Sequence, residues 1–307
     1  MTVNKENKNI INDRKENFRS GFVAIAGAPN AGKSTLLNRV LGEKISITSK
    51  KPQTTRDRIL GIVNRPLSQI IFIDTPGIHS AKSMLNRKIV SQALTAVADV
   101  DIILLIIDVS LRDNKSEKII TEALEKTGKP VVLGLNKIDL VKKHNILPLI
   151  KDFSSILNFR SVIPVSAKTG AQIPELLTDV EKCLPLGPGL FPKDTLTDMS
   201  EKFIAAEMIR EKVFRLTGME IPYSIAVTVD SFKTGKKLIV IHASIHVAHD
   251  SQKGIIIGRA GQMLKKIGQQ ARKDIQRMTG SKVLLKLFVR VTKNWNRNEK
   301  ILKEFGY

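Results

Sequence analysis

GAPNAGKST, residues 27–35, is the most informative stretch of this sequence. It fits the pattern G-x-x-x-x-G-K-[ST], follows the apolar run FVAIA at 22–26, and opens a stretch with helical periodicity. In such a strand–loop–helix context, glycines let backbone N–H groups surround phosphate oxygens at the positive end of a helix dipole. The predicted phosphate-binding residues are Gly27, Ala28, Pro29, Asn30, Ala31, Gly32, Lys33, Ser34 and Thr35.

Two side chains of this loop, and a second motif, have distinct predicted roles. We expect Lys33 to reach the β- and γ-phosphates of a nucleotide and the Ser34 hydroxyl to bind Mg²⁺. The motif DTPG, residues 74–77, ends another apolar run. Asp74 is placed to hold Mg²⁺ through water, and the Gly77 N–H can meet a γ-phosphate.

Two further motifs at strand ends predict which base is bound. In NKID, residues 136–139, Asp139 can accept two hydrogen bonds from the guanine edge, which adenine does not offer. SAK, residues 166–168, would support the same base with a backbone N–H. The order and spacing of the four motifs predict a GTP site. Its predicted guanine-binding residues are Asn136, Lys137, Asp139, Ser166, Ala167 and Lys168.

Short apolar runs alternate with helical periodicity from 21 to 183, including an amphipathic stretch at 84–98. This alternation predicts an α/β domain with a mostly parallel sheet covered on both faces. The proline- and glycine-rich segment LPLGPGLFPKD breaks the pattern. The predicted division is a polar tail at 1–20, a GTPase domain at 21–183, a linker at 184–197 and a smaller α+β domain at 198–307.

The second domain contains another glycine loop, IIIGRAGQMLKKI at 255–267, but no second nucleotide motif. It matches the I-G-x-x-G signature of KH domains, which clamp about four nucleotides of a single strand. We expect a strand before this loop and a helix over 261–278 after it. The predicted RNA-binding residues are Gly258, Arg259, Ala260, Gly261, Lys265 and Lys266.

Charge supports a polyanionic partner. The chain has 50 Lys and Arg against 29 Asp and Glu, a net charge of +21, and residues 253–304 carry 14 basic and 3 acidic residues. Such a field favours nucleic acid first and an acidic membrane surface second. A single cysteine, and no apolar run long enough to span a bilayer, predict a soluble protein of a reducing cytosol.

GAPNAGKSTLLNRVLGEKISITSKKPQTTRDRILGI, at 27–62, resembles the bacterial Era family of ribosome-associated GTPases, and the likeness extends over about 21–295. The resemblance implies that Thr55 meets Mg²⁺ when GTP is bound, with Thr54 as the second candidate. It also implies that Asn30 helps to bind K⁺, although Asn30 could instead only cap its loop. Ile78 stands where a Ras-like enzyme has its water-orienting glutamine, so we expect slow intrinsic hydrolysis.

The family's role implies binding near the 3′ end of 16S ribosomal RNA and maturation of the small ribosomal subunit by a cytoplasmic monomer. We expect GTP and GDP states to differ in RNA affinity, with the linker transmitting the change. Two alternatives are an RNA-binding module with a merely structural nucleotide domain, and a membrane-surface GTPase. Peripheral contact with the inner membrane also stays open as a secondary property. Ala260 stands where the family more often has glycine, and we expect little consequence.

A few other residues invite functional readings. His242, His246 and His249 could suggest a metal, but no cysteine or carboxylate cluster completes a site, so we expect structural or RNA-facing histidines. Phe288 is expected in the core, whereas Trp295 could equally stack on a base. Cys183 is expected to be a small buried hydrophobe.

Overall fold

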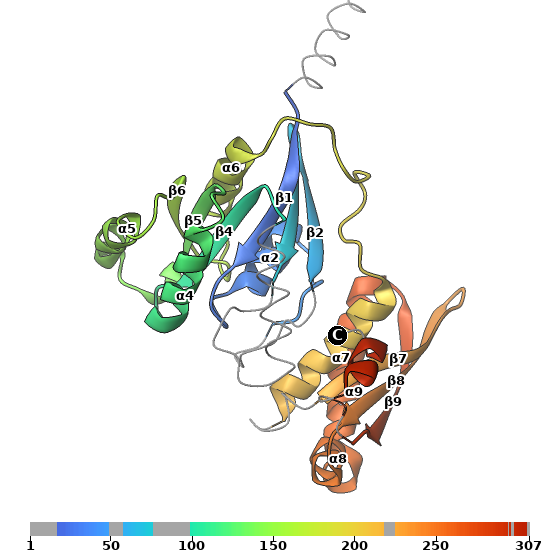
Figure 1. The fold of residues 1–307 in the computed structure, drawn as a ribbon. Helices are drawn as coiled ribbons and strands as arrows, with labels where there is room; N and C mark the ends of the chain where they lie inside the picture. Colours follow the sequence, from blue (N-terminus) through green and yellow to red (C-terminus); the bar gives the residue numbers. More distant parts are fainter. Residues whose placement is uncertain are drawn as a thin grey trace, which may run out of the picture. The chain divides into compact units, whose positions relative to one another are not determined.

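In this computed structural model the described residues are 17–48, 58–75, 99–217, 225–293, 295 and 298–305. The chain forms two compact units, which are described one at a time (Figure 1). The first unit comprises Met1–Gly42, Arg58–Ala81 and Ile89–Asp198, and the second comprises Glu43–Asp57, Lys82–Lys88 and Met199–Tyr307. The helix predicted at 84–98 lies outside the described residues.

The first unit is built on a six-stranded sheet with the order β2-β3-β1-β4-β5-β6. The strands are β1 (Arg19–Ala26), β2 (Ile59–Arg65), β3 (Ser68–Asp74), β4 (Ile102–Asp108), β5 (Val131–Asn136) and β6 (Ser161–Val165). All neighbours pair in parallel except β2 and β3, which form an antiparallel hairpin. The predicted mostly parallel α/β fold is confirmed. The edge strand β2 was missed; it ends at Arg65, and only Pro66 and Leu67 separate it from β3.

Buried side chains cover both faces of this sheet, as expected for parallel strands. On one face, Ile103 and Leu105 of β4 share a core with Ile120 of α4 (Asn114–Glu125) and Phe153 of α5 (Ile146–Ser154). The alternate residues Ile102, Leu104 and Ile106 are also buried. Helices α2 (Lys33–Leu41) and α6 (Ile173–Cys183) contact the strands as well. The sheet thus holds the loops after β1, β3, β5 and β6 at one edge.

The predicted linker is bound along the first unit. The side chain of Gln69 in β3 accepts hydrogen bonds from the backbone N–H groups of Leu190 (2.7 Å) and Phe191 (2.8 Å). The Ile62 N–H of the edge strand β2 donates to the Leu196 carbonyl over 2.8 Å. Residues up to Asp198 therefore belong to the first unit.

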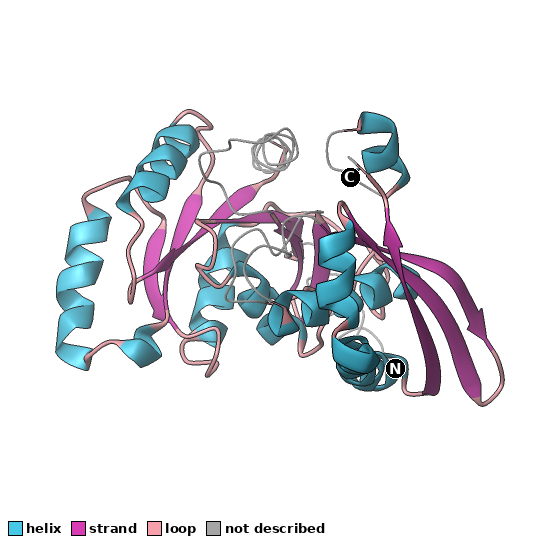
Figure 2. Cartoon of the chain, turned by 90° about the horizontal axis from the view of Figure 1, so that it is seen from below, coloured by secondary structure: helices cyan, strands magenta, loops and turns pink. Residues whose placement is uncertain are grey.

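The second unit contains a three-stranded sheet with the order β7-β8-β9, whose long strands Figure 2 shows in magenta. Strands β7 (Ile225–Thr234) and β8 (Leu238–Val247) are antiparallel, and β9 (Lys282–Val291) lies parallel to β8. Its described α-helices are α7 (Glu201–Leu216), α8 (Asp250–Ile257), α9 (Gln262–Thr279) and α10 (Glu299–Glu304). This α+β arrangement confirms the predicted fold class of the second domain.

Helix α8 corrects one prediction. The run before the second glycine loop is helical, whereas we expected a strand from its three consecutive isoleucines. A reciprocal cap starts the helix: the His249 side chain accepts from the backbone of Gln252, and the Gln252 side chain accepts from the His249 N–H over 3.2 Å. Such a capping box satisfies N–H groups that a helix start otherwise leaves unbonded. None of the described helices is long and apolar enough to cross a membrane.

Candidate nucleotide and nucleic-acid sites

The first glycine loop connects β1 to α2 and has a backbone that only glycine permits at its two ends. Gly27 has φ 151° and Gly32 has φ 104°. A Cβ atom on Gly27 would lie 2.4 Å from the Ile106 carbonyl oxygen, and one on Gly32 would lie 2.1 Å from Nδ2 of Asn136. The loop is therefore packed closely against β4 and β5 while α2 begins at its far end, which is the geometry of a phosphate cradle.

Lys33 is buried at the start of α2. Its ammonium group donates to the carbonyls of Gly27 (3.0 Å) and Ala28 (2.9 Å), so its head lies inside the loop. Burial lowers the pKa of Lys33 to about 8, and the negative charge of Asp74 only partly opposes this. A buried cation that lacks full electrostatic compensation attracts an anion, as expected of a residue that binds phosphate.

The two predicted Mg²⁺ ligands of the described chain lie together. The Ser34 hydroxyl donates to Oδ2 of Asp74 over 2.7 Å, although the residues are 40 positions apart. Asp74 ends the buried strand β3, and its own side chain is buried. A hydroxyl and a carboxylate oxygen are the hard donors that Mg²⁺ prefers, so the residues present fit this ion.

The two base-recognition motifs are joined by hydrogen bonds. The Ser166 hydroxyl donates to Oδ1 of Asp139 over 2.7 Å, and it accepts from the Thr169 N–H over 3.1 Å. Lys137 has a left-handed backbone (φ 69°) and forms an ion pair with Asp108 at the end of β4. The structure thus brings NKID and SAK to one place.

Asn136 links the first glycine loop to the two base-recognition motifs, which the sequence did not reveal. Its Nδ2 donates to the Ala31 carbonyl over 2.7 Å, and its Oδ1 accepts from the Ala167 N–H over 2.9 Å. The sequence predicts it to be a guanine-binding residue without a defined role. In this structure it holds the phosphate loop against the base loop, and its burial protects both hydrogen bonds from water.

Sequence reasoning missed Arg39 as well. From the last turn of α2 its guanidinium donates to the carbonyls of Ala167 (3.2 Å) and Lys168. This contact fixes the loop that carries the predicted base-binding N–H. The only sequence signal was a basic residue in the last turn of the helix that the phosphate loop starts, which is too common to be diagnostic.

Several predicted residues cannot be placed. Thr54, Thr55, Gly77 and Ile78 lie outside the described residues. Asn30, the predicted K⁺ residue, lies in the loop with φ 64°. Its role therefore stays a prediction.

The second glycine loop lies between helices α8 and α9 and is tightly formed. Gly258 has φ 72° and ψ 175°, a region that only glycine occupies comfortably. A Cβ there would lie 2.6 Å from Cβ of Met263. Gly261, with φ 73°, has open space around its α-carbon and caps α9. Between them Arg259 and Ala260 are exposed, and Ala260 is held at φ 49°.

A groove of about 470 Å³ runs beside this loop, between α9 and β9. The residues that line it are Gly261, Leu264, Lys265, Gly268, Gln269, Arg272, Leu285 and Leu287. Lys265 and Arg272 are exposed one above the other on α9, because residues seven apart share a helix face. An apolar floor of leucines with basic groups on one wall suits bases below and phosphates above. The neighbouring Lys266 is exposed but does not line the groove.

The aromatic residues correct one expectation and decide one question that the sequence left open. Phe288, expected in the core, is 48% exposed. It lies on the face of the sheet that points away from α9 and contacts the His242 ring edge-on, with 6.3 Å between ring centroids. Trp295 is fully buried and packs on Phe305 at 5.7 Å, so it does not stack on a base. His246 is also buried, with ring nitrogens 2.9 Å from Thr228 Oγ1 and 3.1 Å from Thr292 Oγ1, which makes it structural. Cys183 is half-buried, and this burial raises the pKa of its thiol.

Comparison with known families finds the same two kinds of domain. A family model described as a 50S ribosome-binding GTPase matches residues 22–137, and a KH-domain model matches residues 220–296. A protein named GTPase Era from Geotalea daltonii is 54% identical over 294 residues, covering 95% of this chain and 99% of its own. GTPase Era from Syntrophus aciditrophicus is 50% identical over 292 residues, covering 94% of this chain and 95% of its own.

Two solved structures match the whole fold. One is a point variant of Aquifex aeolicus Era bound to GDP and AlF4⁻, and the other is Era in complex with MgGDPNP and nucleotides 1506–1542 of 16S ribosomal RNA. Each has a TM-score of 0.90 and 41% sequence identity, over 94% of this chain and 99% of its own.

Proposed function

The chain belongs to the Era family of GTPases, and from this premise we propose that it is a GTP-hydrolysing switch that binds the 3′-end region of 16S ribosomal RNA and promotes maturation of the small ribosomal subunit. One observation carries the proposal: the chain holds two tightly formed glycine loops whose backbones suit phosphates in different settings. Gly27–Gly32 suits a nucleotide, and Gly258–Gly261 opens onto a groove large enough for several bases.

The nucleotide half rests on groups that act at different ends of GTP. Lys33 and the loop N–H groups bind the phosphates, and Asp139, oriented by Ser166, accepts from guanine. Ser34 and Asp74 would hold Mg²⁺, which neutralises phosphate charge when bound. Mg²⁺ accompanies the nucleotide in the related Era complex.

We further propose that hydrolysis is slow without help. An isoleucine at position 78 cannot orient water, so another group must complete the site. The proposed helper is a K⁺ ion bound with Asn30, whose left-handed backbone lies in the phosphate loop. Faster hydrolysis in K⁺ than in Na⁺ buffer would support this, and equal rates would remove it.

The RNA half rests on charge and on the α9 groove. The exposed Arg259 of the loop and Lys265 of the groove can pair with phosphates of a single strand, while Leu285 and Leu287 form an apolar floor beneath its bases. In a related structure, Era is in complex with nucleotides 1506–1542 of 16S ribosomal RNA. We propose that the same region is the target here, bound by a cytoplasmic monomer. Contact with anionic lipid is a separate prediction of the net charge of +21, and vesicle sedimentation with RNA competitor would check it.

The test is RNA binding by a Gly261→Asp variant, measured by fluorescence anisotropy with an oligonucleotide of the 16S 3′ end. A carboxylate at the mouth of the groove repels the RNA backbone, so we expect affinity to fall at least about tenfold, which corresponds to about 1.4 kcal/mol. GTP hydrolysis stimulated by the same RNA should fall with it.

The matched control is Gly280→Asp. Gly280 has φ 63° and open space around its α-carbon, like Gly261, but it caps the opposite end of α9. It therefore places the same added charge at a glycine with a similar left-handed backbone, without facing the loop. Equal RNA affinity in the two variants would contradict the assignment of the groove.

A further inference from the structure

One short segment of the GTPase sequence belongs to the RNA-binding unit. Residues 43–48 directly follow helix α2, which the phosphate loop starts, yet they group with Met199–Tyr307. Ile45, Ser46 and Ile47 are buried. The segment is therefore a fixed part of the second unit and not a loose connection.

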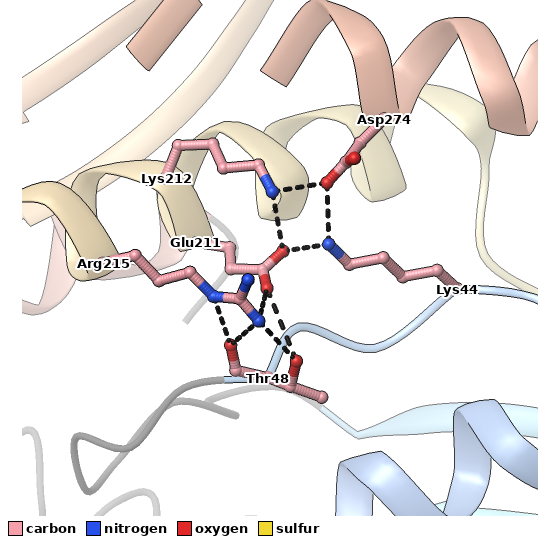
Figure 3. Close-up of polar contacts among 6 residues, drawn as sticks. All are labelled: Lys44, Thr48, Glu211, Lys212, Arg215 and Asp274. Carbon is pink, nitrogen blue, oxygen red and sulfur yellow. Dashed lines mark hydrogen bonds and ion pairs between the residues drawn. The ribbon is translucent and has the colours of Figure 1, made fainter. Parts of the chain in front are cut away.

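A network of charged groups anchors Lys44, near the start of this segment. The Lys44 ammonium lies 2.7 Å from Oδ2 of Asp274 in α9 and forms an ion pair with Glu211 in α7 (Figure 3). Lys212 lies 2.5 Å from the same Asp274 oxygen and 3.7 Å from Glu211 Oε2. Two carboxylates and two ammonium groups thus join three segments of the chain.

The same network also anchors the end of the segment. The Arg215 guanidinium donates to the Thr48 carbonyl over 3.0 Å and to its hydroxyl over 2.9 Å (Figure 3). Arg215 also pairs with Oε1 of Glu211 over 2.7 Å. Glu211 is therefore the shared centre that connects Lys44 and Thr48 to α7.

Burial makes this network sensitive to the loss of a member. The side chain of Glu211 is 0% exposed and that of Lys212 is 6% exposed. Removing one partner of a buried ion pair leaves an uncompensated charge, which costs far more than losing a surface pair. Burial alone would raise the pKa of Asp274, but Lys212 and Lys44 outweigh it and hold the pKa below its usual value. Asp274 is therefore charged at neutral pH, as Lys44 is.

Asp274 connects this network to the RNA site. It lies on α9, the helix that Gly261 caps and whose Lys265 and Arg272 line the groove. In the sequence, Lys44 stands between the phosphate loop and the predicted switch residue Thr55. The network thus joins chain from the nucleotide site to the helix that forms the RNA groove.

The linker at 184–197 offers no comparable connection among the described residues. Its hydrogen bonds go to the first unit, from Leu190 and Phe191 to Gln69 and from Ser20 to the Pro188 carbonyl over 2.5 Å. Asn64 adds a bond of 2.8 Å to the Lys193 carbonyl. A segment that is bound to the first unit along its length is poorly suited to transmit a conformational change of that unit to the second unit.

We propose that Lys44, Glu211 and Asp274 are positioning residues that couple the nucleotide state of the GTPase site to the RNA affinity of the α9 groove. This inference rests on the proposed function. It replaces the linker, our first expectation, with segment 43–48 as the route of transmission. Because linkage is reciprocal, RNA bound at the groove influences the nucleotide site through the same residues.

The experiment measures RNA affinity of the full chain by anisotropy, with a GTP analogue and with GDP, and takes the ratio of the two. Coupling between sites typically changes affinity by about 5–150-fold. We expect Lys44→Gln to bring this ratio to within about twofold of one, and Lys44→Arg to restore it, because the charge is what the network requires. Asp274→Asn tests the network from α9 and should give the same loss.

Two controls identify the route. Lys118→Gln makes the same chemical change at an ammonium group of a 79% exposed side chain on α4, and Asn64→Ala releases a linker hydrogen bond. Both should keep the wild-type ratio, and thermal unfolding confirms that each variant is folded. If Lys44→Gln and Asp274→Asn keep the wild-type ratio, or if only Asn64→Ala loses it, the inference is wrong while the proposed function stands. Absence of RNA binding by the wild type would overturn both. Equal RNA affinity of the wild type in the two nucleotide states would overturn the inference alone.

Discussion

Lys33 shows how a single side chain can be prepared for its ligand. Burial removes its hydration and so disfavours its charged form until an anion arrives, although two loop carbonyls accept hydrogen bonds from its ammonium group. The sequence predicted its contact with phosphate from the motif alone. It could not predict the altered pKa, because that depends on burial by residues from other strands.

We predict that nucleotide binding takes up a proton at alkaline pH. The free protein has a Lys33 pKa of about 8, lowered from 10.5 by burial, and bound phosphate must raise it again. The ammonium is already charged well below pH 8, so affinity is unaffected there and weakens as pH rises above about 8. Calorimetry of GDP binding at pH 9, in buffers of different ionisation enthalpy, measures the uptake. Binding without proton uptake at that pH would contradict the assignment.

Ala260 has an energetically unfavourable backbone conformation. Its φ of 49° lies in the left-handed region, which costs a non-glycine residue about 1–2 kcal/mol. We predict that Ala260→Gly stabilises the second unit by roughly 0.5–1 kcal/mol, since the greater freedom of glycine in the unfolded chain offsets part of the relief. Urea unfolding measures the change. A Gly-to-Ala change at Gly280, with φ 63°, should shift stability in the opposite direction.

At the scale of elements, the apolar runs indicated most strands correctly, because each buried strand of the parallel sheet is a short, nearly continuous hydrophobic segment. Helix α8 was missed since Ile255, Ile256 and Ile257 favour a strand by local propensity. The reciprocal cap between His249 and Gln252 instead marks a helix start, and histidine is not among the preferred capping residues. The bridge made by Asn136 was unpredictable for another reason: it depends on how three distant loops meet.

The aromatic cluster near the C-terminal end of the described chain, which packs against β8, gives a prediction about stability. Trp295 is fully buried against Phe305, and Phe305 lies 4.3 Å from the His246 ring of β8. We expect Trp295→Ala to destabilise the second unit by about 3–5 kcal/mol, because it leaves a large cavity. Phe288→Ala, at a half-exposed position, should cost less than about 1 kcal/mol. Hydrogen exchange of β8 amides compares the stability of the two variants. Similar losses of protection would mean that the two aromatic residues are equally important for packing.

At the scale of the whole molecule, the net charge of +21 governs the encounter with any polyanion. We predict that the logarithm of RNA affinity falls linearly with the logarithm of salt concentration, by about 0.7 for each phosphate contacted. Lys265→Ala, in the groove, should reduce this slope by about 0.7, whereas Lys118→Ala, on α4, should leave it unchanged. A salt titration of anisotropy measures both slopes. An unchanged slope for Lys265→Ala would mean that this lysine meets no phosphate.

The segment at 184–197 also matters for colloidal behaviour. Strand β2 is an outer strand of the six-stranded sheet, and an uncovered outer strand is a template for pairing with other chains. The Leu196 carbonyl accepts a hydrogen bond from the Ile62 N–H of this strand, and the Lys193 carbonyl accepts one from the Asn64 side chain. The segment thus protects the GTPase sheet from intermolecular β-addition. A GTPase fragment cut before Leu184 would therefore aggregate more readily than one that ends at Asp198.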